Sequence, residues 1–356
     1  MKSLGNFPDP FIAEISGQPQ ALQRAGNGAI EQAQALDAAA APARRGRIVL
    51  SGMGSSYDAC YPAVTALATS GVATLMLDAA ELLHFRLPII RDEDLLVLVS
   101  QSGESAETVG VARALRAAAR TPTIACVTNG TGNTLTSLAD VALDTRAGEE
   151  TGPSTMTFFC ALAVLGALAR TIAGAPGRDA AAAIAREADR AADAVTALVA
   201  DRALPDRLAA WHGGRATTVI LGRGAARAAA EMGALTIKEA AGMPVESLQA
   251  AQFRHGPLEL AGPELAAIVL ATEPETAELD RDLAADLAEL GAAVLLVTAG
   301  GPVPSGTMSI AIGSLDRLLS PAAAVVPAQL LAWRLSVTSG RTPGSYIHAS
   351  KVTTRE

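Results

Sequence analysis

This 356-residue chain contains few cysteines and few aromatic residues, and it has no excess of basic over acidic residues. Its three cysteines, Cys60, Cys126 and Cys160, have a spacing that fits neither a zinc site nor a redox motif, so we expect buried, unpaired thiols. Aromatic residues make up 3% of the chain, and 36 acidic residues outnumber 28 basic ones. The chain therefore has few aromatic side chains to stack on bases and no surplus of Lys and Arg to neutralise phosphates. We expect no nucleic-acid partner.

Long hydrophobic runs are also absent. The longest, over 156–169, stops at Arg170 and is too short to cross a bilayer, which favours a buried helix. Residues 1–10 are polar and contain proline, unlike the basic and then apolar start of a signal peptide. These features predict a cytoplasmic protein with no membrane partner.

Short apolar runs alternate with helical stretches, and half of all residues are hydrophobic. Expected strands lie at 47–51, 72–77, 94–99, 123–127, 141–143, 217–221, 266–270, 293–298 and 309–312. Strand–helix alternation with continuously apolar strands indicates parallel sheets covered by helices on both faces. Because the pattern restarts near residue 215, the sequence predicts an α/β fold with two tandem doubly wound parallel sheets, each a flavodoxin-like three-layer sandwich.

The same pattern suggests five segments. We expect an N-terminal helical segment at 1–45, a first α/β subdomain at 46–176, a helical linker at 177–214, a second subdomain at 215–337 and a C-terminal tail at 338–356.

Two turns of the first half have unusual chemistry. One is Gly52-Met53-Gly54-Ser55-Ser56, and the other is Ser100-Gln101-Ser102-Gly103-Glu104-Ser105; each follows a strand and opens a helix. Parallel sheets bind ligands at the carboxyl ends of their strands, where hydroxyls and helix N-termini favour an anion. The turns predict a phosphate site that uses no Lys or Arg.

Three alternatives compete with that interpretation. Gly52-Met53-Gly54 could begin a dinucleotide fingerprint with Asp78 as the ribose acid, although Tyr57 stands at the third glycine. Ser102 could be a nucleophile, but the Gly-x-Ser-x-Gly pattern is not met. The turns could also simply cap helices.

The Ser-Gln-Ser-Gly-Glu-Ser turn resembles the phosphosugar-binding loop of sugar isomerase (SIS) domains, and most of all the isomerase half of glucosamine-6-phosphate synthase. Further motifs of the same family occur in the same order from about residue 9 to the end. They are Gly54-Ser55-Ser56-Tyr57, Leu221-Gly222-Arg223-Gly224, Lys238-Glu239, Arg254-His255-Gly256-Pro257 and Ser350-Lys351-Val352-Thr353.

The resemblance implies a role for each matching residue. Glu239 would move a proton between C1 and C2, and Lys351 in a catalytic tail would meet the open-chain carbonyl. His255 would assist ring opening, and in the family this histidine reaches the neighbouring subunit's site. The sugar 6-phosphate would be held by Ser56, Ser100, Gln101, Ser102 and Ser105. The sugar would contact Gly54, Ser55, Ser154, Thr155 and Ser350.

The chain departs from the family pattern at three places. Lys2 stands where the synthase has its nucleophilic cysteine, and 1–45 is too short for a glutaminase domain, so we expect no glutaminase activity. Thr236 replaces the first lysine of the family's Leu-Lys-Leu-Lys-Glu. Residues 150–156 replace Glu-Ile-Gly-Val-Ala-Ser-Thr-Lys, with the Ser-Thr pair shifted and the lysine lost, which leaves the sugar's identity open.

The resemblance implies a phosphosugar aldose–ketose isomerase or an amino-sugar-6-phosphate deaminase that works by acid–base enolisation. It implies no metal, nucleotide or other cofactor, and a homodimer with sites near the subunit interface. A non-catalytic sugar-phosphate sensor is the alternative from another class.

Overall fold

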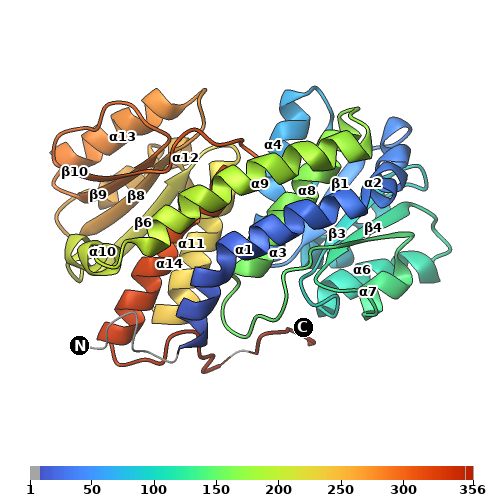
Figure 1. Ribbon diagram of the computed structural model, residues 1–356, viewed down its shortest axis with the longest axis horizontal. Coiled ribbons are helices and arrows are strands. Elements are labelled where there is room, and N and C mark those ends of the chain that lie inside the picture. The colour runs from blue at the N-terminus through green and yellow to red at the C-terminus, as the bar shows by residue number, and fades with distance from the viewer. Residues whose placement is uncertain (1–8, 349, 356) are drawn as a thin grey trace. The chain divides into compact units, whose positions relative to one another are not determined.

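The computed structural model describes residues 9–348 and 350–355; the remaining residues of the expected 1–45 and 338–356 segments lie outside this range. The chain divides into two compact units, each built on one sheet (Figure 1). The first-sheet unit comprises 20–150, 155–189 and the tail from His348 onward. The second-sheet unit comprises 9–19, 151–154 and 190–347.

The first-sheet unit contains five parallel strands in the order β2-β1-β3-β4-β5. Their bounds are β1 Ile48–Gly52, β2 Thr74–Asp78, β3 Leu95–Val99, β4 Thr123–Thr128 and β5 Val141–Asp144. On one face α2 (Ala33–Ala40) and α4 (Cys60–Thr69) pack against α8 (Met156–Ile172). On the other face, α6 (Ala106–Ala117) and α7 (Thr134–Leu138) close a core that contains Val111, Leu115 and Ile124.

The second-sheet unit repeats this topology, with five parallel strands in the order β10-β9-β8-β6-β7. Their bounds are β6 Thr217–Gly222, β7 Glu246–Gln249, β8 Leu265–Ala271, β9 Ala293–Thr298 and β10 Thr307–Ala311. Helices α10 (Leu204–His212), α11 (Ala226–Ala241) and α14 (Ser320–Thr338) pack together. Helices α12 (Ala250–Phe253) and α13 (Ala277–Glu289) close the other core.

Helices α1 (Pro10–Glu31) and α9 (Gly177–Ala200) each contribute residues to both units. Small residues let these helices approach closely within the first-sheet unit, where a Cβ on Gly26 would lie 3.0 Å from the Cα of Ala185. The same device operates between α11 and α14, where a Cβ on Gly233 would lie 3.0 Å from the Cβ of Ala328. The alanine-rich composition thus serves close helix packing.

Burial follows the expected pattern. Every residue of the central strands β1, β3 and β8 is buried, as parallel strands covered on both faces require. The two-sheet α/β fold predicted from the sequence is confirmed, and the three cysteines are free and buried. Within the described residues, no helix combines the length and apolarity needed to span a bilayer.

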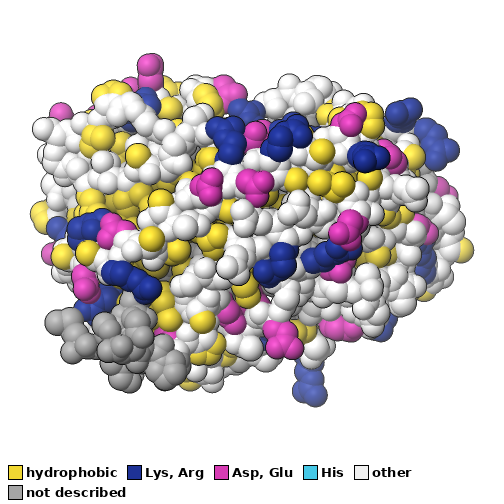
Figure 2. Space-filling view, in the orientation of Figure 1, with side chains coloured by type: hydrophobic (Ala, Val, Ile, Leu, Met, Phe, Trp, Pro, Cys, Tyr) yellow, Lys and Arg dark blue, Asp and Glu magenta, His cyan; other side chains and the backbone are white. Residues whose placement is uncertain are grey.

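Surface charges of both signs are interspersed. Figure 2 shows Lys and Arg side chains next to Asp and Glu over the visible face, without a broad basic area among the residues described there. On this visible face, the described residues form no extended basic surface of the kind that binds a polyanion.

Candidate functional site

The first turn follows β1 and is shaped by two glycines. Gly54 has φ 50°, a left-handed conformation that glycine adopts without a steric penalty. At Gly52, a Cβ would lie 2.8 Å from the carbonyl oxygen of Val99, so only glycine allows β1 and β3 to approach this closely. The turn then enters α3 (Ser55–Asp58), which carries the Ser55 and Ser56 hydroxyls at the carboxyl edge of the sheet.

The second turn follows β3 and places three hydroxyls before α6. Ser100 Oγ lies 3.0 Å from Ser105 Oγ and accepts a hydrogen bond from the Gly103 N–H at 3.2 Å. Ser102 Oγ accepts from the Glu104 N–H at 3.1 Å. Gly103 has φ 67°, and a Cβ there would lie 2.1 Å from the Asn133 side chain. The loop is therefore held in place before any ligand binds.

The two turns are joined directly. The Gln101 N–H donates to Ser56 Oγ at 3.3 Å, and the Gln101 carbonyl accepts from the Asn129 N–H at 2.9 Å. Ser56 and the serine loop thus lie at one edge of one sheet, as expected for the carboxyl ends of adjacent parallel strands.

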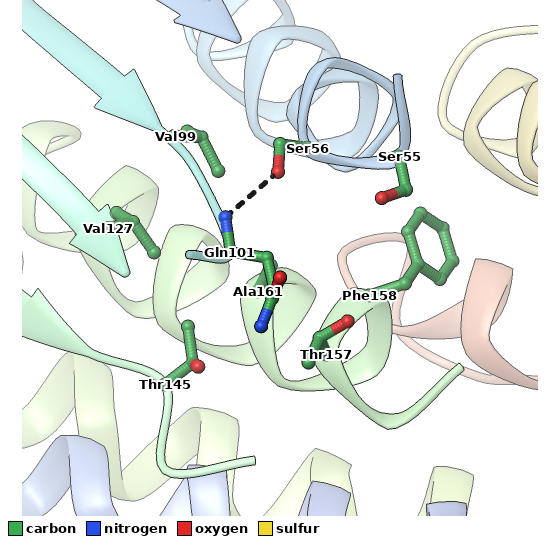
Figure 3. Close-up of a pocket in the computed structure, with 9 residues that line it drawn as sticks. All are labelled: Ser55, Ser56, Val99, Gln101, Val127, Thr145, Thr157, Phe158 and Ala161. Carbon is green, nitrogen blue, oxygen red and sulfur yellow. Dashed lines mark hydrogen bonds between the residues drawn. The ribbon is translucent and has the colours of Figure 1, made fainter. Parts of the chain in front are cut away.

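A recess of about 260 Å³, part of it open to solvent, lies at this edge. It is lined by Ser55, Ser56, Val99, Gln101, Val127, Thr145, Thr157, Phe158 and Ala161. Figure 3 shows the Gln101 side chain extending into the space bordered by Thr145 and Thr157, with the Ser56 bond above it. Hydroxyl and amide groups on apolar walls suit a small polar ligand.

Lys351, in the C-terminal tail of the first-sheet unit, lies near the recess. Its Nζ lies 2.6 Å from Glu150 Oε2, and that oxygen also accepts from the Thr157 hydroxyl at 2.5 Å. Thr157 itself lines the recess. Glu150 therefore connects the tail lysine to Thr157 in the wall of the recess.

The tail has a second attachment beside the serine loop. The Thr353 carbonyl accepts a hydrogen bond of 3.1 Å from the Ala106 N–H, the first N–H of α6. Ser350 Oγ donates within the tail to the Val352 carbonyl at 2.7 Å. One backbone donor at the α6 N-terminus is thus already used by the tail.

Glu239 and His255 belong to the second-sheet unit. Glu239 is half-buried on α11, in the helix predicted to carry it, and His255 is exposed in the turn that follows α12. Thr236, where the family pattern has a lysine, is fully buried and donates to the Met232 carbonyl at 2.8 Å. The structure therefore brings the serine turns and Lys351 together in one unit and describes Glu239 and His255 in the other.

Ser154 and Thr155 separate at the unit boundary. Ser154 belongs to the second-sheet unit and Thr155 to the first. The Thr155 hydroxyl is fully buried and donates to Glu150 Oε1 at 2.9 Å.

Sequence reasoning missed Glu150, Thr145, Thr157 and Phe158. The available signal was the altered 150–156 motif, whose position showed that the segment borders the site but gave no side-chain partners.

At the corresponding edge of the second sheet lies the buried side chain of Glu273. Gly224, with φ 51°, stands where the first repeat has Gly54, and the next residue, Ala225, donates its N–H to buried Glu273. Glu273 follows β8 as the serine loop follows β3, and its Oε2 lies 3.4 Å from the Arg317 Nη2. Burial raises the pKa of Glu273 to about 7 despite the opposing effect of Arg317.

The described residues contain no group of three or more His, Cys, Asp or Glu side chains arranged to hold a metal ion. What the first-sheet unit offers instead is neutral hydrogen-bond donors and acceptors at a helix N-terminus, which suit a phosphate ester.

Two doubly wound parallel sheets, one with a hydroxyl-lined recess at its carboxyl edge, define an α/β protein. The family model for the SIS domain matches residues 43–170 and 215–339, and the chain belongs to the SIS domain family. The resemblance predicted from the serine loop is thereby confirmed.

Curated relatives include two archaeal proteins described as glutamine–fructose-6-phosphate aminotransferase (isomerizing). The one from Pyrobaculum aerophilum is 29% identical over all of this chain, and the one from Aeropyrum pernix is 30% identical over 99% of it. The chain spans 59% and 58% of their lengths, respectively.

Solved structures show the same fold at low identity. The C-terminal domain of glucosamine-fructose-6-phosphate aminotransferase from Francisella tularensis matches with a TM-score of 0.82 and 21% identity, over 97% of this chain and 100% of that one. Tagatose-6-phosphate ketose/aldose isomerase from Escherichia coli matches with 0.80 and 21%, over 97% and 98%. Glucosamine-6-phosphate deaminase from Thermotoga maritima matches with 0.74 and 19%, over 97% and 99%.

Proposed function

We propose that this chain binds a sugar 6-phosphate in the first-sheet unit and interconverts a ketose with an aldose or a 2-amino-aldose. The observation that carries the proposal is the preorganised loop of Ser100, Ser102 and Ser105 at the start of α6. Hydrogen bonds to a charged group contribute roughly 1.5–3 kcal/mol each, so a few hydroxyls and N–H groups suffice for useful affinity.

The proposed chemistry is proton transfer along C1 and C2. With the phosphate anchored, Glu239 takes a proton from one carbon and returns it to its neighbour, while an acid stabilises the charge that develops on the carbonyl oxygen. His255 assists ring opening, and the Lys351 ammonium faces the open-chain carbonyl. On a 2-amino sugar, ketose formation passes through an imine at C2, and water then releases ammonia.

Related proteins support this proposal without choosing the sugar. Proteins with the same fold include a tagatose-6-phosphate ketose/aldose isomerase and a glucosamine-6-phosphate deaminase. Membership of the SIS family makes the same ligand class the natural first candidate for this chain. The proposal concerns chemistry on the sugar and is independent of any partner that supplies or receives nitrogen.

The test is solvent exchange. The chain is incubated in D₂O with glucosamine 6-phosphate, fructose 6-phosphate and other 6-phosphates, and deuterium at C1 or C2 is followed by NMR together with released ammonia. Exchange without ammonia identifies an isomerase, and exchange with ammonia identifies a deaminase. Saturable binding with no exchange on any sugar would contradict the enzyme and support a sugar-phosphate sensor.

A further inference from the structure

Glu150 is a completely buried carboxylate at the start of the segment that leads into α8. Its Oε1 accepts hydrogen bonds from the Thr155 N–H, the Thr155 hydroxyl and the Thr157 N–H, at 2.8–3.1 Å. Its Oε2 accepts from the Thr157 hydroxyl at 2.5 Å and from Lys351 Nζ at 2.6 Å. Both oxygens are therefore fully engaged.

A buried carboxylate is costly unless a cation compensates its charge. Four of the five contacts to Glu150 come from neutral donors within 150–157, and Lys351 supplies the positive charge from 201 residues away. The Lys351 side chain is 19% exposed. Such a charge-assisted bond restricts a lysine far more than the neutral contacts of a surface tail would.

The pair also has a defined place. Thr157 lines the recess and shares Glu150 Oε2 with the ammonium, while Thr353 is fixed to the first N–H of α6 beside the serine loop. The tail is thus attached at two points, through Lys351 to the carboxylate that contacts Thr157 and through Thr353 to the start of α6. We propose that Glu150 is the positioning residue that holds the Lys351 ammonium at the site, an inference that rests on the proposed function for its catalytic meaning.

The first experiment tests the contact between Glu150 and Lys351 by the chemical reactivity of the lysine, and it needs no activity assay. The sequence contains three lysines, Lys2, Lys238 and Lys351, so an amine-acetylating reagent followed by peptide mass spectrometry resolves each one. Relative to exposed Lys238, Lys351 should react slowly in the wild type and roughly tenfold faster in Glu150→Gln, since a charge-assisted bond is lost. Thr157→Val removes one neutral bond to the same oxygen and should leave the Lys351 rate within about twofold.

Glu150→Asp keeps the charge and guards against a folding defect in Glu150→Gln; it should retain most of the slow reaction. Equal Lys351 reactivity in the wild type, Glu150→Gln and Glu150→Asp would overturn the proposal. Far-UV circular dichroism of each variant identifies any loss of fold.

The second experiment tests by steady-state kinetics whether this contact affects turnover. Glu150→Gln should lower kcat while changing KM little, and Lys351→Met should do the same. The double variant should be no slower than Lys351→Met alone, because residues that act as a unit are not additive. Faster acetylation of Lys351 with unchanged kcat, or fully additive losses, would overturn the positioning role. If the wild type turns over no sugar phosphate, the proposed function fails, while the acetylation result still decides whether Glu150 holds Lys351.

Discussion

Glu150 Oε2 and Lys351 Nζ lie 2.6 Å apart although 201 residues separate them in the chain. The contact returns the C-terminal tail to the sheet that carries the serine loop, and both residues belong to the first-sheet unit. Lys351 lies in the tail that follows the whole second sheet, and its partner Glu150 accepts a hydrogen bond from Thr157 of the recess wall.

Removing the proposed base should separate turnover from binding. We predict that Glu239→Gln lowers kcat by about 100-fold or more, because general-base catalysis contributes typically 10²–10⁴-fold. Phosphosugar affinity, measured by isothermal titration calorimetry, should stay within about threefold, since the phosphate loop lies in the other unit. The matched control is Glu246→Gln, a solvent-exposed glutamate that should behave as the wild type. Wild-type turnover in Glu239→Gln would remove this residue from the mechanism.

The serine loop should control affinity. Ser102→Ala and Ser105→Ala each remove a hydroxyl at the start of α6, and each should weaken inorganic phosphate and phosphosugar binding by about 10- to 100-fold. Ser137→Ala is the control, because its exposed hydroxyl donates to the Thr134 carbonyl within α7. Equal affinities for all three variants and the wild type, measured by calorimetry, would place the phosphate elsewhere.

The buried carboxylate of the second sheet should make stability depend on pH. Burial raises the pKa of Glu273 from 4.5 to about 7, so the folded state holds a proton that the unfolded state releases. This contribution to stability is fully present below pH 4.5 and is lost as the pH rises through 7. The free energy of unfolding of the wild type relative to Glu273→Gln should therefore fall across this range, by about 3 kcal/mol at most.

Urea titrations at pH 4.5, 6 and 7.5 measure this difference. Glu289→Gln, an exposed position at the end of α13, is the control and should track the wild type at each pH. Parallel curves for the wild type and Glu273→Gln would show that the two states bind protons equally at this residue.

An ion pair between partly exposed Arg47 and buried Asp94, at the start of β1, should contribute to stability. Asp94 is 1% exposed and accepts from the Arg47 backbone N–H, the Arg47 guanidinium and the Arg91 N–H. Asp94→Asn should lower the free energy of unfolding by about 2–4 kcal/mol at pH 7, because it leaves these donors without their charged acceptor. Glu93→Gln, which breaks only an exposed pair with Arg91, should cost less than about 1 kcal/mol.

The ion pair of Arg47 and Asp94 should also make the free energy of unfolding depend on pH in acid. Burial acts to raise the pKa of Asp94, but the hydrogen bonds from Arg47 and Arg91 together bring it below its ordinary 3.8. The stabilisation is present above pH 3.8 and is lost as the pH falls through the lowered value. The difference between the wild type and Asp94→Asn should therefore shrink in strong acid, and a difference that grows there would contradict this assignment.

The repeating strand pattern predicted the fold because buried parallel strands are continuously apolar. The strand at Glu246–Gln249 escaped prediction because its residues, Glu-Ser-Leu-Gln, lie on the edge of a sheet and need not be apolar. Helix α13 was also missed, since Ala277–Glu289 buries only one narrow stripe and is otherwise acidic.

The serine turns were predictable because each lies directly after a strand and before a helix, so the local pattern fixes their place. Glu150 was not, because its partner Lys351 is distant in sequence and no periodicity links them. The proposed roles of Glu239 and His255 depend on family resemblance, and the fold alone does not supply them.

Glu273 gives the internal repeat a further meaning. In the second sheet the carboxyl group beside the left-handed glycine is covalently part of the chain and lies next to Ala225 and Arg317. The two halves thus keep one backbone design, while in the second half the Glu273 side chain occupies the position that the proposed phosphate takes in the first. Inheriting two copies of a turn does not double the number of ligands, and phosphate titrations should saturate near one equivalent per chain.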